Sequence, residues 1–95
     1  MNFDDINGLS PEIMWFANEM EGVLQRNDHK TGWSNLTNKW LLNRLKQEVK
    51  ELERAIKKDM FVVLEATDIA NFAMMIADNY RSKKEEEQLR KEENE

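Results

Sequence analysis

Cysteine is absent from the sequence, and glycine and proline are scarce, with three glycines and a single proline in 95 residues. The lack of cysteine excludes disulfide bonds and metal sites built on thiolates, and it fits a cytoplasmic protein. No apolar run approaches the roughly 20 residues that span a membrane, and the first residues lack the basic and apolar regions of a signal peptide. We therefore expect a cytoplasmic protein without a membrane partner.

The charge balance is acidic, with 14 basic side chains, 19 acidic side chains and a net charge of −5. A protein that binds nucleic acid or membrane surfaces carries a basic face, so nucleic acid is not an expected partner. Charged residues make up 35% of the chain. Together with the scarcity of helix-breaking residues, this composition predicts an all-α fold.

The chain is short for the number of large apolar side chains that it carries. One domain of this length buries only about 60–65% of its extended surface. The three tryptophans, four phenylalanines and six methionines therefore need further cover, which helical oligomers commonly supply. We expect self-association as a dimer or a tetramer.

Three segments show apolar residues at helical spacing. Ser10, Pro11 and Glu12 form a helix start, with a capping hydroxyl, a proline in the first turn and an acid near the positive end of the helix dipole. A polar break that contains Gly32 and Trp33 follows the first helix. The expected helices cover residues 11–26, 37 or 38–58, and 60 to about 80.

The connection between the second and third helices is short, so these helices should pack as antiparallel neighbours. Asp59 is expected to end the second helix and to cap the third. Residues 83–95 are charged or amide side chains except for Leu89, and they form either a helical extension or a disordered tail. The predicted architecture is an antiparallel bundle of three main helices over residues 1–82, followed by this charged tail.

Two acidic pairs, each at i, i+3 spacing, fall in the second and third helices. Glu48 and Glu51 flank the apolar stripe of the second helix, at about 60° and 120° from Leu45. Glu65 lies in the middle of an apolar face, because several apolar residues and Asp68 fall within about 60° of it. The apolar residues are Phe61, Ile69, Phe72 and Ile76. A carboxylate in such a position is costly to bury unless it is protonated or bound to a cation.

The two acidic pairs are matched about the turn. Glu51 precedes the turn by about eight residues and Glu65 follows it by about seven, so these two should face each other, as should Glu48 and Asp68. Four carboxylates predict a site for Mg²⁺ or Mn²⁺. His29, the only histidine, falls in the expected loop, which disfavours zinc and di-iron sites. The alternative is that the acids are ordinary salt-bridged residues whose partners are Arg44, Lys50 and Arg54.

The block Gln47-Glu48-Val49-Lys50-Glu51-Leu52, followed by Glu65-Ala66-Thr67-Asp68, resembles the signature of the MazG-like all-α nucleoside triphosphate pyrophosphohydrolases. The resemblance covers roughly residues 15–80. It implies Mg²⁺-dependent hydrolysis of a nucleoside triphosphate, such as a dNTP, to the monophosphate and pyrophosphate. Glu48, Glu51, Glu65 and Asp68 would hold the metal, and Glu48 or Glu51 would be the catalytic base that activates water. Gln47 departs from the pattern, which has an acid at this position.

The triphosphate substrate also needs cationic, amide and aromatic partners near the four acids. The residues expected to bind it are Lys30, Trp33, Asn71, Asn79 and Arg81. Trp33 is separated from Glu48 by about eleven helical residues, or roughly 16 Å, so the loop of a partner subunit is expected to complete the pocket. Each candidate also has a structural interpretation as a solvated charge, a helix cap or a core aromatic residue.

Two other functions remain open from the sequence. The chain could be a non-catalytic helical interaction module with a charged tail. Within the enzyme class, it could be a phosphoribosyl-ATP pyrophosphohydrolase. No residue pattern fixes which base or sugar is preferred.

Overall fold

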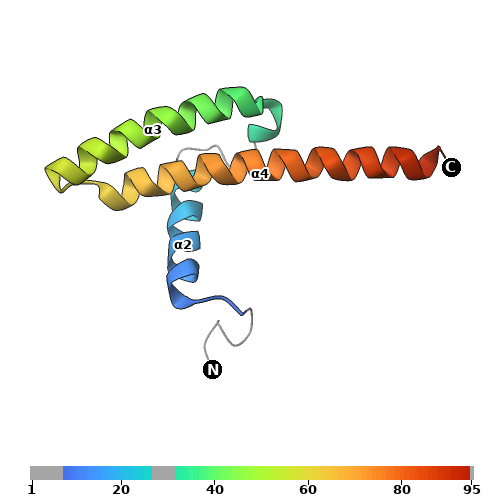
Figure 1. Ribbon diagram of the computed structural model, residues 1–95. Coiled ribbons are helices and arrows are strands. Elements are labelled where there is room, and N and C mark those ends of the chain that lie inside the picture. Colours follow the sequence, from blue (N-terminus) through green and yellow to red (C-terminus); the bar gives the residue numbers. More distant parts are fainter. Residues whose placement is uncertain (1–7, 27–31, 95) are drawn as a thin grey trace.

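The computed structural model describes residues 8–26 and 32–94, and all regular structure within these ranges is helical (Figure 1). The predicted all-α fold is therefore confirmed. The elements are α2 (Pro11–Arg26), the short 3₁₀ helix η1 (Trp33–Asn35), α3 (Asn38–Lys58) and α4 (Val62–Glu93). None of these helices is both long and apolar enough to cross a membrane.

Local capping sets the first turns of α2 and α3. The hydroxyl of Ser10 accepts a hydrogen bond from the backbone N–H of Ile13 at 3.3 Å. The hydroxyl of Thr37 accepts one from the backbone N–H of Trp40 at 3.1 Å. Each bond satisfies a backbone donor that has no partner within its own helix, so both helices begin where the sequence predicts.

The turn between α3 and α4 uses two residues in the left-handed backbone region. Asp59 has φ 57° and ends α3, with its backbone N–H directed to the carbonyls of Ala55 and Ile56. Phe61 has φ 64° and precedes the first residue of α4 without a side-chain cap. The expectation that Asp59 also caps the next helix is wrong, because the chain needs Met60 and Phe61 to reverse direction before α4 begins.

The helices α3 and α4 lie side by side and run in opposite directions, while α2 crosses this hairpin rather than following it (Figure 1). Each of the three helices contributes one residue to the central cluster of the core, namely Leu24, Leu41 and Met75. The side-chain Nδ2 of Asn71 in α4 also donates to the carbonyl of Met20 in α2 at 3.2 Å. These contacts fix α2 against the first half of α4.

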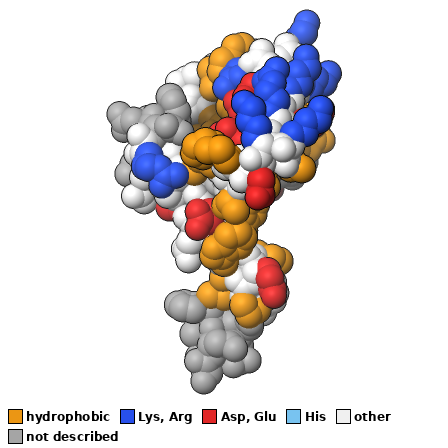
Figure 2. Space-filling model, turned by 90° about the vertical axis from the view of Figure 1, so that its left-hand side faces the viewer, with side chains coloured by type: hydrophobic (Ala, Val, Ile, Leu, Met, Phe, Trp, Pro, Cys, Tyr) orange, Lys and Arg blue, Asp and Glu red, His pale blue; other side chains and the backbone are white. Residues whose placement is uncertain are grey.

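The fold leaves much apolar surface exposed. Trp15 in α2 is 51% exposed and Phe61 at the hairpin turn is 65% exposed. Figure 2 shows apolar side chains on the lower part of one face, where α2 projects from the hairpin, and basic side chains gathered at the top.

The charged segment that follows residue 82 continues α4 as far as Glu93. It extends past the hairpin at the right of Figure 1. Pairs of side chains one turn apart, Lys84 with Glu87 and Gln88 with Glu92, form hydrogen bonds along its surface. Such pairs support a solvated helix by a few tenths of a kcal/mol, roughly 0.2–0.5 each.

Candidate metal centre

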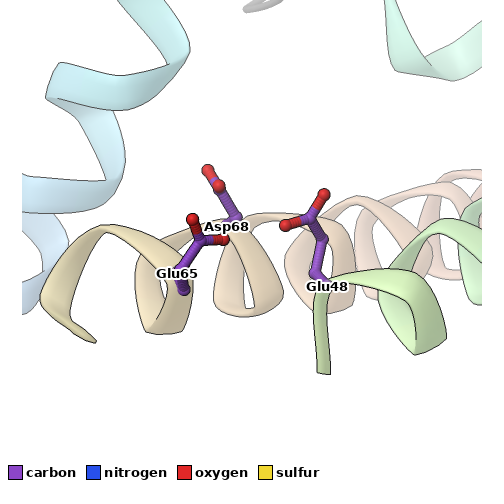
Figure 3. Close-up of side chains that lie close together, drawn as sticks. All are labelled: Glu48, Glu65 and Asp68. Carbon is purple, nitrogen blue, oxygen red and sulfur yellow. The ribbon is translucent and has the colours of Figure 1, made fainter. Parts of the chain in front are cut away.

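Three carboxylates meet between α3 and α4. Glu48 comes from α3, and Glu65 and Asp68 come from consecutive turns of α4. One oxygen from each residue lies within 4.8 Å of the other two. In Figure 3 the three side chains point to the same side of the helix pair. The i, i+3 spacing places Glu65 and Asp68 on one face of α4, and the antiparallel packing of α3 brings Glu48 to them.

Glu51 lies outside this three-carboxylate cluster. Its carboxylate pairs with Arg54 on the same helix, and its side chain is 49% exposed. An exposed ion pair of this kind contributes about 0–1 kcal/mol, so it is a weak restraint on the carboxylate. Glu51 still lies near enough to Glu65 for its charge to act on that residue. Its role as a fourth ligand and as a catalytic base stays a prediction.

Mutual repulsion and burial act on the acids of α4. The pKa of Glu65 is raised, first by burial, then by a hydrogen bond with Glu48 and by the negative charges of Asp68 and Glu48. The pKa of Asp68 is also raised, by burial and by the charge of Glu48, and the positive charge of Arg44 opposes this rise. Glu65 and Asp68 therefore hold protons more tightly than isolated carboxyl groups do, and a bound cation would release them.

The chemistry of the donors fits a hard divalent cation. Carboxylate oxygens are the ligands that Mg²⁺ and Mn²⁺ prefer. In the part of the chain that the structure describes, the cluster contains no nitrogen or sulfur donor. A zinc or di-iron site would normally include histidine. Glu48, Glu65 and Asp68 could therefore hold a hard divalent cation, and the choice of Mg²⁺ or Mn²⁺ stays a prediction.

A pocket of about 490 Å³ opens beside the cluster. Glu48 and Asp68 form part of its wall. The rest combines aromatic rings, one cation and one amide with apolar side chains of α2 and α4. The wall residues with an aromatic or polar side chain, other than these two acids, are Trp33, Trp40, Arg44, Asn71 and Phe72. An organic anion could thus place its apolar part in the pocket and its charge near the carboxylates and a cation held there.

Trp33 and Asn71, two of the expected substrate-binding residues, lie in the pocket wall. The indole Nε1 of Trp33 donates to Asp78 at 2.9 Å, which holds the ring against α4. Asn71 is only 3% exposed. Because its Nδ2 donates to Met20, the amide orientation is fixed. The Oδ1 atom of Asn71 is then buried without a hydrogen-bond partner among the described residues.

The other expected binding residues have different positions. Asn79 donates to the backbone carbonyls of Trp33 at 3.0 Å and Leu36 at 3.4 Å, so it anchors η1 to α4. Arg81 pairs with Asp78 at 2.9 Å and is largely exposed. Neither belongs to the pocket wall as the described residues define it. Lys30 lies outside the described residues.

Trp33 shares the pocket with Glu48 and Asp68 of the same chain. The indole reaches this pocket from its own chain because η1 folds back on α4, where Asp78 and Asn79 bind it. Completion of the pocket by a partner's loop stays a prediction.

Trp40 and Phe72 line the pocket without having been expected there. A signal for Trp40 was present in the sequence, since Trp40, Arg44 and Glu48 follow one another at intervals of four residues. This spacing places them along one side of a helix. Phe72 follows Asp68 by four residues on α4, so the same reasoning applies to it.

No family model, curated protein or solved structure matches this chain. The resemblance to the MazG-like enzymes therefore depends on the acidic motifs alone.

Proposed function

We propose that the protein is a Mg²⁺-dependent nucleoside triphosphate pyrophosphohydrolase of the MazG-like type. Its reaction adds water across the bond between the α- and β-phosphates and yields a nucleoside monophosphate and pyrophosphate. The observation that carries this proposal is the contact between an acidic cluster and an aromatic pocket. The carboxylates of Glu48, Glu65 and Asp68 gather within 4.8 Å, and two of them form the wall of a pocket that also holds Arg44.

The acids have two roles in this proposal. Glu48, Glu65 and Asp68 hold the divalent cation, and Glu51 joins them when it leaves Arg54. A cation bound there would neutralise the triphosphate and act as a Lewis acid. Glu48 or Glu51 accepts the proton of the attacking water as a general base. The carboxylates alone would repel a triphosphate, so the activity must depend on the metal.

The pocket residues suit a nucleoside. Trp33, Trp40 and Phe72 offer aromatic faces, on which any base can stack. Asn71, a residue of the pocket wall, has a buried Oδ1 without a hydrogen-bond partner among the described residues, so it has acceptor capacity to spare. These features support a nucleotide, including a dNTP, without selecting a base. Phosphoribosyl-ATP, which also carries a base and a triphosphate, remains the alternative substrate within the enzyme class.

Self-association as a dimer or a tetramer is part of the proposal. It is supported by exposed apolar residues on α2 and at the hairpin turn, such as Trp15 and Phe61. The same exposed residues favour the second candidate function, a non-catalytic helical module that binds another protein. The two candidates differ in whether the acidic cluster has catalytic activity.

A panel of canonical and modified dNTPs and NTPs, together with phosphoribosyl-ATP, tests the proposal by detecting pyrophosphate. Release in Mg²⁺ and its loss in EDTA are expected for at least one member. Glu65→Gln should abolish the release. The matched control is Glu53→Gln, because Glu53 is an exposed acid on α3 outside the cluster. No release from any substrate, with a folded protein and Mg²⁺ present, would favour the non-catalytic module.

A further inference from the structure

Arg44 lies at the boundary between the acidic cluster and the pocket. One of its terminal nitrogens donates to Oε1 of Glu48 at 3.0 Å. The other donates to the side-chain carbonyl of Gln47. Its guanidinium carbon sits 5.2 Å from the centroid of the Phe72 ring. The residue thus bonds a proposed metal ligand while its side chain forms part of the pocket wall.

The pair between Arg44 and Glu48 differs from the other ion pairs of the structure in its surroundings. The Glu48 side chain is only 12% exposed and belongs to a cluster of three acids. The acid of each of the other pairs, Glu51, Asp78 and Glu87, lies outside the cluster. Among the described residues, Arg44 is the one cation that hydrogen-bonds to a member of the cluster. It partly neutralises three carboxylates that would otherwise repel one another.

A divalent cation and Arg44 compete for the same carboxylate. A cation among the three acids takes up the negative charge that attracts Arg44, and it repels the guanidinium. The Arg44 side chain can move away from Glu48 toward the pocket, because its guanidinium already lies over the Phe72 ring on the pocket side and the side chain is 34% exposed. A guanidinium released toward the pocket presents paired N–H donors, which match phosphate oxygens.

We propose that Arg44 is an internal counter-ion of Glu48 that a divalent cation displaces, and that the released guanidinium then binds the phosphates of the ligand. The second step depends on the proposed function, whereas the first depends only on cation binding. Arg44 therefore links the filling of the metal centre to phosphate recognition. Gln47 assists by holding the guanidinium beside Glu48 without adding a negative charge.

Two titrations of the whole chain test this inference. Isothermal titration with Mn²⁺ in the absence of nucleotide measures the competition, and titration with tripolyphosphate in excess Mg²⁺ measures the phosphate contact. The variants are Arg44→Gln and Arg44→Lys. The matched control is Lys46→Gln, which removes one positive charge from an exposed position of α3. Circular dichroism at the temperature of the titrations checks that each variant is folded.

Opposite changes are expected in Arg44→Gln. Mn²⁺ should bind roughly five- to tenfold more tightly, because a competing charge is lost near the site. Tripolyphosphate should bind at least about tenfold more weakly, because a charge-assisted contact is lost. Arg44→Lys should keep the Mn²⁺ affinity of the wild type and part of the affinity for tripolyphosphate. Lys46→Gln should change neither.

The outcomes separate the inference from the proposed function. If the wild type binds Mn²⁺ and Arg44→Gln binds it equally or more weakly, the counter-ion role is wrong while the proposed function stands. If Mn²⁺ binds more tightly but tripolyphosphate binding is unchanged, the phosphate contact is wrong. If the wild type binds no Mn²⁺, both the inference and the metal-dependent function are overturned.

Discussion

Replacing Glu65 by glutamine removes one negative charge from the acidic cluster and keeps the shape of the side chain. At a separation of 4.8 Å, two unit charges repel by about 0.9 kcal/mol in water and by about 3.5 kcal/mol at the effective dielectric near a protein surface. Glu65 is partly exposed, so solvent screens this repulsion and the lower value applies. The apo form of Glu65→Gln should therefore be more stable than the wild type by about 1 kcal/mol.

The predicted stabilisation corresponds to a rise in melting temperature of roughly 4–8 °C for a domain of this size. The effect of Mg²⁺ should have the opposite sign. A cation that binds only the folded state raises the melting temperature of the wild type. Glu65→Gln should lose most of this rise, together with the hydrolysis of the nucleoside triphosphate. In the absence of metal, Glu65→Gln should thus be more stable than the wild type, and Mg²⁺ should change its melting temperature little.

Thermal melts followed by circular dichroism, with EDTA or with Mg²⁺, measure both effects. Glu53→Gln, an exposed acid on α3, is the control and should behave as the wild type does in both conditions. If Glu65→Gln melts below the wild type in EDTA, repulsion within the cluster is not the dominant interaction of Glu65. If it keeps full Mg²⁺-dependent activity, Glu65 is not a metal ligand.

Three further predictions concern pH, the pocket wall and assembly. Burial and neighbouring acids raise the pKa values of Glu65 and Asp68 in the folded state, so the folded chain retains protons that the unfolded chain releases. As the pH increases from the ordinary carboxyl range through the raised values, the stability of the apo form should therefore fall and the affinity for Mn²⁺ should rise. Melts and Mn²⁺ titrations over this range check both slopes, and a steeper slope in Glu65→Gln than in the wild type would contradict the assignment. Asp78→Asn weakens the bond that orients Trp33, so it should lower the free energy of unfolding by about 0.5–1.5 kcal/mol and also raise KM. Lys30→Ala removes a cation that precedes η1 in the sequence, and it should raise KM while the melting temperature stays that of the wild type. Unchanged KM in both variants, measured by steady-state kinetics alongside melts, would leave these residues with structural roles only. Sedimentation at tens of micromolar should show a dimer or a tetramer, and a monomer would mean that the exposed apolar surface needs no partner copy.

A local signal predicted the start of α2. Ser10, the expected cap, accepts a hydrogen bond from a backbone N–H three residues away, so its effect does not depend on the rest of the fold. Thr37 caps α3 in the same way, at the start that was expected at residue 37 or 38. The start of α4 at Val62 could not be predicted in the same way. Phe61 adopts a positive φ, which its residue type disfavours. Closure of the hairpin, rather than local preference, selects that conformation.

The sequence predicted which faces of α3 and α4 carry the acids of the cluster. Spacing along α3 and α4 correctly brought Glu48, Glu65 and Asp68 together. The position of the Glu51 carboxylate depends on a choice between Arg54 and the cluster, and these alternatives differ by too little energy for a helical wheel to separate them. The placement of η1 depends on the contacts of Asp78 and Asn79 with Trp33, more than 40 residues apart along the chain. Such tertiary contacts have no counterpart in a periodic pattern.

We propose hydrolysis of a nucleoside triphosphate between its α- and β-phosphates at the three-carboxylate cluster. Phosphorus NMR of the reaction products tests it most directly, because the monophosphate, pyrophosphate and orthophosphate give separate signals. With the substrate selected by the panel, the wild type and Glu53→Gln should produce monophosphate and pyrophosphate in equal amounts in Mg²⁺ and neither product in EDTA, while Glu65→Gln should leave the triphosphate intact. Formation of orthophosphate and a diphosphate, or unchanged turnover by Glu65→Gln, would contradict the account.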